Sequence, residues 1–325
     1  MKLRILSGMR PTGKLHLGNY VGALENWVKL QGKYENFHLV ADWHMLTTTL
    51  DTSMLRQNTY DMVIDWLAAG IDPQVSPIFV QSKIKEHAEL YLIYSMLVTV
   101  PRLERNPTVK EQAKDLGVEN NMIFGHLGYP VLQAADILLY KAHLVPVGED
   151  QLPHVELTRE IARKFNKTYG KVFVIPEGKI TEFSRLPGLD GNKMSKSLGN
   201  TVLLSDSPTD IHQKIMSAVT DPQKIRRGDP GRPEICNVFT YHRKFNPDEV
   251  PEIERDCRSG KLGCVDDKKN LAAKLATYLE PFREKRAYYE KNRAEIDAII
   301  EHGNSVARNV AKQTMSEVYE AMQLG

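Results

Sequence analysis

The sequence predicts an α/β fold in which a parallel sheet is covered by helices, followed by an all-helical part. Up to residue 199, short apolar runs that suit buried strands alternate with segments whose apolar residues recur at helical spacing. After Asn200 the strand-like runs vanish, and long helical patterns rich in Lys, Arg and Glu replace them. Repeated alternation is typical of a doubly wound, Rossmann-like sheet. We therefore expect two domains, 1–199 and 200–325.

The elements are expected in the following order. The first strand is expected at Leu3–Ser7, where an apolar run reaches Gly8, and the first helix over 20–30. Further strands are expected at 38–41, 78–80 and 144–147. Further helices are expected from Asp51 to Leu67 with a stop at Gly70, then over 86–100 and 155–165. In the second domain a helix is expected to start at Ser207, and long helices over 267–293 and 295–322. The last helix is expected to pack back on the first domain.

Composition sets wide bounds. The 325 residues are 42% hydrophobic and 26% charged, which is ordinary for a protein with a sizeable core. No apolar run approaches the roughly 20 residues of a membrane span, and the N-terminal run is too short for a signal peptide. We therefore expect a cytoplasmic protein. The net charge of +2 neither demands nor excludes a polyanionic partner, and 3 cysteines, an odd number, argue against a disulfide framework.

The first strand leads into a glycine-containing turn, Gly8 to Asn19, that opens a helix. Glycines let a backbone approach phosphate closely, and a helix N-terminus offers unpaired N–H groups and a positive dipole. His16 can donate to a phosphate oxygen. An ordinary glycine-rich connector explains this turn equally well when it is taken by itself.

A second signal is the segment Lys193-Met194-Ser195-Lys196-Ser197, which Gly191 and Gly199 flank. Two lysines in a glycine-bounded loop suit a clamp on a triphosphate, because they offset the charge that develops on departing pyrophosphate. A random solvated loop explains the composition but not the pairing with the first turn. Together the two segments resemble the HIGH and KMSKS signatures of class I aminoacyl-tRNA synthetases, with His16-Leu17-Gly18-Asn19 in place of HIGH.

A third pattern concerns the amino acid. Pro130 suits a first helical position, and Tyr129, Gln133 and Asp136 then share one face of an otherwise apolar helix. A solvent-facing polar stripe would look the same. As a pocket, Asp136 would accept a hydrogen bond from an indole N–H, while Tyr129 and Gln133 would hold the α-ammonium. A phenylalanine substrate would leave the buried carboxylate unpaired.

The chain from Leu6 to Met322 resembles bacterial tryptophanyl-tRNA synthetases, on these motifs and on Val145-Pro146-Val147-Gly148-Glu149-Asp150-Gln151. The resemblance implies ATP contacts at Arg10, Pro11, Thr12, Gly18, Asn19, Gly148, Glu149, Asp150, Leu186, Lys193, Met194, Ser195, Lys196 and Ser197. It implies tryptophan contacts at Leu6, Tyr129, Gln133, Asp136, Val145, Val147 and Gln151. It implies catalytic roles for His16, Asn19, Lys110, Lys193 and Lys196. Many members have Gln at the position of Arg10 and Met at that of Gln133, so handling of the substrate's charged groups is expected to differ.

Three cysteines, Cys236, Cys257 and Cys264, fall in one short stretch of the second domain. A subset of the family carries a four-cysteine 4Fe-4S site there, and the fourth position is Asp267 in this chain. Thiolates are the usual ligands of such clusters and a carboxylate is a poorer one. The alternatives are a labile cluster and a vestigial site with packed or free thiols. We expect the vestigial site.

The resemblance implies that the chain activates L-tryptophan with Mg-ATP and transfers it to the terminal adenosine of tRNA(Trp), acting as a homodimer with no membrane or DNA partner. Three alternatives remain. A tyrosyl-tRNA synthetase usually has a tyrosine on the first strand, where this chain has Ile5-Leu6-Ser7. A nucleotidyltransferase without tRNA would not need the helical domain. A non-catalytic RNA-binding or redox-sensing paralogue would not need His16, Lys193 and Lys196.

Overall fold

The computed structural model describes residues 2–180 and 186–324. These residues form two compact units. The first comprises residues 2–13, 26–180 and 291–324, and the second comprises 14–25 and 186–290. The chain thus leaves the first unit at the glycine turn and returns to that unit at residue 26. After its second passage through the second unit, it ends in the first unit. The predicted division into a catalytic domain over 1–199 and a helical anticodon-binding domain over 200–325 assigns functions to these parts, and it stays a prediction.

The first unit is built on a parallel sheet that, within the described residues, has five strands in the order β3-β2-β1-β4-β5. The strands are β1 (Arg4–Met9), β2 (Glu35–Val40), β3 (Ile78–Val80), β4 (Leu144–Val147) and β5 (Glu177–Ile180). Each pair is parallel; in the central pair, for example, Leu6 lies beside Phe37. The order reverses between β1 and β4, as in doubly wound folds. The predicted Rossmann-like class is confirmed.

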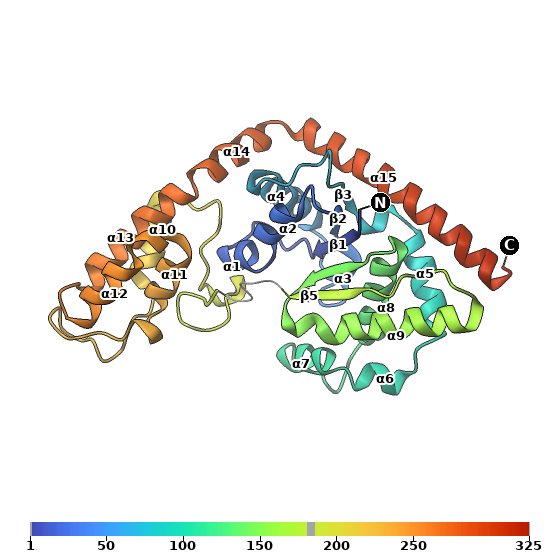
Figure 1. The fold of residues 1–325 in the computed structure, drawn as a ribbon, viewed down its shortest axis with the longest axis horizontal. Helices are drawn as coiled ribbons and strands as arrows, with labels where there is room; N and C mark the ends of the chain where they lie inside the picture. Colours follow the sequence, from blue (N-terminus) through green and yellow to red (C-terminus); the bar gives the residue numbers. More distant parts are fainter. Residues whose placement is uncertain (1, 181–185, 325) are drawn as a thin grey trace. The chain divides into compact units, whose positions relative to one another are not determined.

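Helices cover both faces of this sheet. They are α2 (Glu25–Leu30), α3 (Asp42–Leu46), α4 (Leu55–Ala69), α5 (Glu86–Ser95), α6 (Val100–Glu104), α7 (Pro107–Asp115), α8 (Phe124–Leu139), α9 (Leu152–Tyr169) and α15 (Arg293–Met322). Figure 1 shows α4 and α9 on opposite sides of the sheet. Burial agrees, because every residue of β2 after Glu35 is buried. Strands buried on both faces are rich in apolar residues, and the apolar residues at the end of β2, Leu39 and Val40, explain why a strand was predicted there.

The last helix, α15, protects the edge strand β3. Asn304 on α15 accepts a hydrogen bond from the backbone N–H of Val80 over 2.9 Å, so an edge donor of the strand is satisfied. Gly303 permits this close approach, since a Cβ there would overlap the carbonyl of Ile78.

The second unit is helical, apart from isolated bridges. Its helices are α1 (Leu17–Asn19), α10 (Pro208–Ser217), α11 (Asn237–Phe245), α12 (Val250–Arg258), α13 (Cys264–Tyr278) and α14 (Glu280–Lys291). The start of α10 is the predicted one: Ser207 caps it, and Asp210 reciprocates in a capping box. In the described part of the chain, no helix combines the length and apolarity that a membrane crossing requires.

Four local expectations are wrong. The helix expected over 86–100 is two helices, because Pro101 cannot extend α5 and Thr99 takes an extended backbone at the start of α6. The long helix expected over 267–293 is divided between α13 and α14. Asp51 does not cap α4, whose N-cap is Met54. Pro130 lies inside α8 rather than at its start.

The position of Pro130 has a packing explanation. The turn upstream of it buries His126 and Tyr129. Burial of that turn offsets a proline cost of about 3 kcal/mol in a helix interior. Tyr129, Gln133 and Asp136 therefore still share one helix, as predicted, although that helix begins earlier.

Candidate active site

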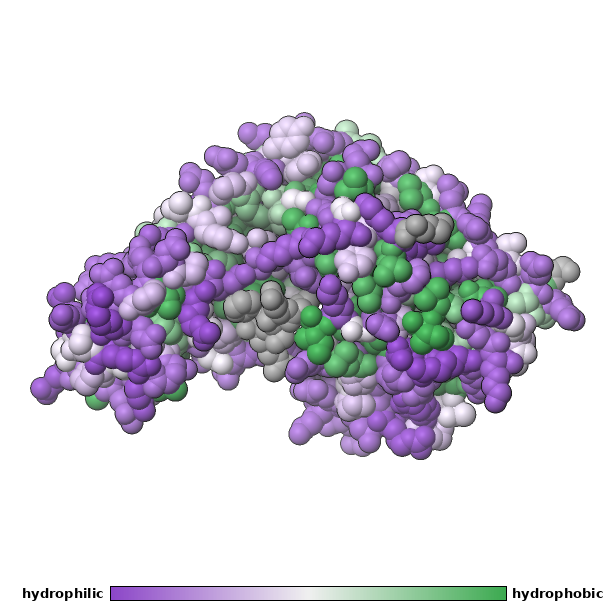
Figure 2. Space-filling view, in the orientation of Figure 1, coloured by the Kyte–Doolittle hydropathy of each residue, from purple (hydrophilic) through white to green (hydrophobic). Residues whose placement is uncertain are grey.

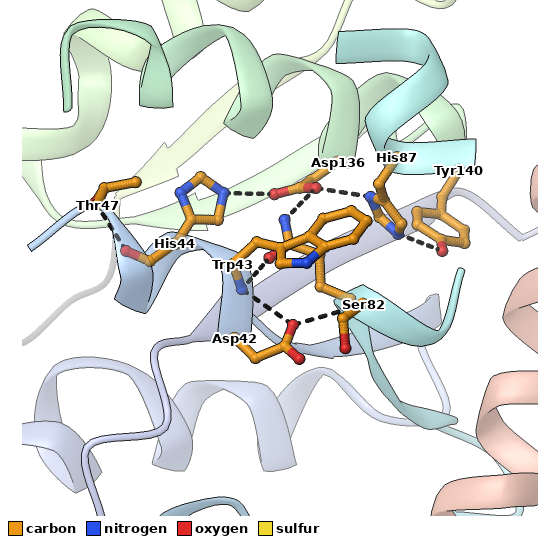
Figure 3. A network of polar contacts seen from close by, with 9 residues as sticks. Asp42, Trp43, His44, Thr47, Ser82, His87, Asp136 and Tyr140 are labelled. Atoms are coloured by element: carbon orange, nitrogen blue, oxygen red, sulfur yellow. Dashed lines mark hydrogen bonds and ion pairs between the residues drawn. The ribbon is translucent and has the colours of Figure 1, made fainter. Parts of the chain in front are cut away.

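The buried carboxylate of Asp136 on α8 is the centre of a polar network in the first unit. It is 3% exposed. Its Oδ1 accepts from Gln81 Nε2 over 2.8 Å and lies 2.7 Å from His87 Nδ1, and its Oδ2 lies 2.7 Å from His44 Nε2. Figure 3 shows His44 and His87 reaching this carboxylate from opposite sides. A carboxylate has about four lone-pair sites, so one site on Oδ2 remains for a ligand.

The network fixes the carboxylate in its ionised form. Burial by itself would raise the pKa of Asp136, but the hydrogen bonds from His44 and His87 outweigh it and hold that pKa below its usual value. His87 is itself oriented, because its Nε2 lies 2.9 Å from the hydroxyl of Tyr140. Gln81 is oriented by the backbone N–H of Trp43, which donates to its Oε1 over 3.1 Å. The site is therefore an acceptor prepared for an N–H or O–H donor.

The surroundings of the network are aromatic and partly open. The Trp43 side chain lies beside the network, and Lys85 Nζ is 5.6 Å from the centre of its ring. On the same helix face as Asp136, Tyr129 is 7% exposed, and Gln133 is half-buried. Of the other predicted tryptophan contacts, Leu6 and Val145 are buried in the sheet, while Val147 and Gln151 are half-buried. Their contact with a substrate stays a prediction.

His44, His87 and Gln81 were missed by sequence reasoning, although a signal exists. His44 follows β2 closely and Gln81 follows β3 directly, so both stand at carboxyl ends of parallel strands. Ligands of doubly wound folds bind at that edge of the sheet. Polar residues placed directly after apolar strands were therefore candidates.

The two nucleotide signatures meet in the second unit. The backbone N–H of Gly18 points at the sulfur of Met194 over 3.2 Å, and His16 forms a bridge with Leu203 just beyond the loop. The motif His16-Leu17-Gly18-Asn19 and the loop 193–197 thus form one local structure. The pairing of the two motifs in the sequence thus corresponds to a direct contact, made through the Met194 side chain.

His16 is set to donate. Its Nδ1 accepts from the backbone N–H of Asn19 over 3.2 Å, so the proton of the neutral ring lies on Nε2. Burial, with a smaller contribution from the Lys196 charge, lowers the pKa of His16 to about 4, so the ring is neutral near pH 7. The helix that His16 caps is too short to form an anion site by itself. Lys193 and Lys196 are exposed and bring the positive charge.

The remaining predicted ATP residues lie in both units. Leu186 is buried in the second unit. In the first unit Arg10 is exposed and donates to Thr48 Oγ1 over 3.3 Å, and Thr12 bonds through its backbone N–H to the Arg10 carbonyl. Pro11 is buried there. The turn 148–151 leads into α9 and exposes Glu149 and Asp150.

Lys110 lies on α7 and lines a cavity of about 570 Å³ with Lys114, Glu104 and Glu119. Apolar side chains such as Val109 and Met122 complete its wall. The structure thus places Lys110 at the wall of this cavity. The contact of Lys110 with ATP stays a prediction.

The cysteines do not form a metal centre in this structure. Cys236 is 6% exposed, and burial raises the pKa of its thiol. Burial also raises the pKa of Cys257 to about 11. Asp267 Oδ1 lies 3.1 Å from His242 Nε2. Within residues 2–180 and 186–324, no group of three or more Cys, His, Asp or Glu side chains is arranged to hold a metal ion.

Comparison with known proteins agrees with this geometry. The model of the family "tRNA synthetases class I (W and Y)" matches residues 1–280. The chain belongs to this family of class I aminoacyl-tRNA synthetases.

Two relatives of high identity are tryptophan–tRNA ligases. One from Thermotoga maritima is 52% identical and covers 99% of this chain and 99% of its own length. One from Aquifex aeolicus is 46% identical over 99% of this chain and 100% of its own. The crystal structure of tryptophanyl-tRNA synthetase from Campylobacter jejuni complexed with ADP and tryptophan has a TM-score of 0.89 at 35% identity, covering 99% of this chain and 100% of that chain. A tyrosyl-tRNA synthetase from Archaeoglobus fulgidus, at 23% identity, shares the fold.

Proposed function

We propose that this chain is a tryptophan–tRNA ligase, which activates L-tryptophan with ATP and transfers it to tRNA(Trp). The observation that carries the proposal is the ionised Asp136 carboxylate, with three donors of its own and one acceptor site left on Oδ2. An indole N–H is a donor on an otherwise apolar ring, and it satisfies that site. Phenylalanine would leave the site unpaired, which discriminates strongly.

The ATP side is assigned to the two signatures of the second unit and to residues of the first. His16 donates through Nε2–H to a phosphate oxygen, with Asn19 holding the ring from behind. Lys193 and Lys196 neutralise the charge that develops on pyrophosphate. Arg10, the turn at 148–150 and Lys110 complete the contacts in this proposal. Relatives support ATP as the nucleotide, because ADP is present in the Campylobacter structure.

The chemistry follows in two steps. A carboxylate oxygen of tryptophan attacks the α-phosphorus of Mg-ATP in line, the bond to the β-phosphate breaks, and pyrophosphate leaves with its electron pair. The 2′-hydroxyl of the terminal adenosine of tRNA then attacks the acyl carbon, loses its proton and releases AMP. Positioning and charge stabilisation supply most of the catalysis, because no side-chain nucleophile is required.

The helical region 200–325 is proposed to bind the anticodon part of tRNA, with α15 supporting the sheet. Figure 2 shows that the visible face over α10–α13 is mostly hydrophilic. Arg226 and Arg227 are exposed in the loop before α11, and Lys261 and Lys269 are exposed nearby in the sequence. Basic side chains on a polar surface suit contacts with phosphates.

Three finer expectations belong to the same proposal. Mg²⁺ is expected to arrive with ATP as part of the substrate. The chain is expected to work as a homodimer in the cytoplasm. The site of Cys236, Cys257, Cys264 and Asp267 is proposed to be a vestigial counterpart of the 4Fe-4S site in the family subset.

ATP–pyrophosphate exchange with each of the twenty amino acids tests the main proposal. We expect exchange with tryptophan, and exchange with phenylalanine at least about 1,000-fold lower in kcat/KM, because phenylalanine lacks a donor for Asp136. Tyrosine has a phenol donor of its own, and we expect it to be a poorer substrate than tryptophan. Tyrosine as the best substrate would overturn the assignment of Asp136 to an indole partner. No exchange with any amino acid, in protein that binds ATP, would point to the paralogue without catalytic activity.

A further inference from the structure

The direction of the Tyr129 hydroxyl can be derived from its neighbours. Asn106 is completely buried and caps α7, and its Oδ1 accepts from the backbone N–H of Thr108 over 3.1 Å. A backbone N–H can only donate, so the bonded atom must be the carbonyl oxygen of the Asn106 side chain. The other end of that side chain, the NH₂ group, therefore faces His154 Nδ1 at 3.2 Å.

The orientation of Asn106 fixes the tautomer of His154. An NH₂ group can only donate, so His154 Nδ1 must carry a lone pair, and the proton of the neutral ring lies on Nε2. Burial, with a smaller effect of His44, lowers the pKa of His154 to about 4, so the ring is neutral near pH 7. Its Nε2 lies 2.9 Å from the Tyr129 hydroxyl oxygen. The Nε2–H of His154 therefore donates to Tyr129.

Tyr129 is left with a proton of its own and one lone pair. Among the described residues, the Tyr129 hydroxyl has His154 as its hydrogen-bond partner and no second one. The His126 and His44 rings lie edge-on to the Tyr129 ring at 5.6 and 6.4 Å. The charges of Arg10 and Asp150 both act on Tyr129, in opposite directions, but its hydroxyl bonds His154 and not the Asp150 carboxylate.

We infer that Asn106 and His154 are positioning residues that force the Tyr129 hydroxyl to donate to the substrate, and that this proton and the Arg10 guanidinium bind the α-carboxylate of the amino acid. One carboxylate oxygen accepts from Tyr129, and the other is free to attack ATP. The remaining lone pair of Tyr129 can still accept from the adjacent ammonium, beside Gln133. The inference rests on the proposed function and adds to it how the reacting group is held.

The variant Asn106→Asp tests this directly, because it reverses the direction of the hydrogen bonds that run from Asn106 through His154 to Tyr129. Aspartate still caps α7 through its carboxylate, but it can only accept, so it favours the proton of His154 on Nδ1. His154 Nε2 then becomes an acceptor and takes the Tyr129 proton away from the substrate. At lower pH, protonation of His154 beside the introduced carboxylate restores a donor at Nε2. The variant should therefore bind tryptophan more weakly as the pH rises, whereas the wild type should not show this trend.

The measurement is the Kd of tryptophan and of tryptamine, which lacks the carboxylate, between pH 6 and pH 9. We expect the variant to lose about tenfold in tryptophan affinity at high pH, which corresponds to one hydrogen bond, with tryptamine changed less than about twofold. The wild type carries the same other titratable groups, His44 and Asp150 beside His154 and Arg10 and His126 beside Tyr129. Its pH profile is therefore the reference for them.

Two further results decide the matter independently of folding defects. The ¹⁵N spectrum of His154 in the wild type should show the Nε2–H tautomer, and an Nδ1–H tautomer would overturn the inference. In a Tyr129→Phe background, Asn106→Asp should have no further effect on tryptophan affinity. Equal weakening of tryptophan and tryptamine, or no weakening of either, would also overturn it. Wild-type protein that fails to activate tryptophan would instead refute the proposed function.

Discussion

Asn200 Nδ2 donates to Asp190 Oδ1 over 2.8 Å and so joins the two ends of the loop that carries Lys193 and Lys196. The same side chain accepts from the backbone N–H of Ser195 over 2.8 Å and donates to the Lys193 carbonyl over 3.1 Å. One buried carboxamide thus holds the backbone of the loop from inside, while the lysine side chains remain exposed.

Asn200→Ala should therefore loosen the loop without changing the binding of tryptophan. We expect the kcat of ATP–pyrophosphate exchange to fall about tenfold or more, while the Kd of tryptophan stays within about twofold. Asn192→Ala is the matched control, because Asn192 also bonds Asp190 but is exposed, and it should leave kcat nearly unchanged. Equal losses in both variants would show that Asn200 does not act through the loop backbone.

Asp136→Ala should remove the partner of the indole N–H. A hydrogen bond to a charged group is worth about 1.5–3 kcal/mol, and the donors of His44, Gln81 and His87 would lose their acceptor as well. We expect kcat/KM for tryptophan in the exchange assay to fall at least about 100-fold. Asp136→Asn, which keeps the shape, should also be defective. A change of less than about threefold, in protein with a normal melting temperature, would contradict the pocket assignment.

Lys196→Ala should lower the activation rate with little effect on tryptophan affinity. A charge that stabilises departing pyrophosphate acts mainly in the transition state, so kcat should fall about 100-fold. Single-turnover formation of the adenylate separates this step from product release. Lys285→Ala is a matched control, because Lys285 is an exposed lysine of the same unit that lies outside both nucleotide signatures. A variant whose defect lies wholly in tryptophan binding would contradict the role.

The sequence predicted the central strands because their side chains are buried on both faces. Each of these strands contains buried apolar residues, such as Leu6 in β1, Leu39 in β2 and Phe79 in β3, and short apolar runs bounded by turns indicate buried strands. Strand β5 was missed because Glu177 and its neighbours up to Ile180 are all exposed. It exists through backbone pairing with β4, and such pairing leaves no hydrophobic pattern to detect.

The site was predicted only in part for a related reason. Tyr129 and Asp136 could be associated because helical spacing joins them within one element. His44, His87 and Gln81 come from three other segments that the sheet brings together, and no local pattern encodes distances across a fold. The carboxyl ends of β2 and β3 were the available clue.

The exposed arginines before α11 lead to a prediction about tRNA. Replacing Arg226 and Arg227 by Gln should weaken aminoacylation and flatten its dependence on salt. With fewer phosphate contacts, fewer counterions are released when tRNA binds. Exchange without tRNA should stay normal. Replacing Arg163 and Lys167 on α9 by Gln removes the same charge from the first unit and should change neither assay. Equal losses in aminoacylation and exchange would indicate a structural defect instead.

The cysteines lead to a prediction about iron. Protein purified without oxygen should contain no stoichiometric iron or sulfide, should be colourless, and should keep its melting temperature after treatment with a chelator. The physical reason is that Asp267 stands at the position of the fourth thiolate, and a carboxylate is a poorer ligand for such a cluster.

The opposite outcome has its own signature. Iron and sulfide retained in stoichiometric amounts through purification, with visible absorption, would show that Cys236, Cys257 and Cys264 hold a cluster. One iron would then have a weak oxygen ligand and be lost most easily. Asp267→Cys would in that case slow iron loss, because it restores a soft ligand at the fourth position, whereas Asp266→Cys, one residue away on the exposed side of α13, would not. In a vestigial site neither substitution by itself should bring iron into the protein, because the thiols of Cys236 and Cys257 still have to lose their protons and leave their packed positions.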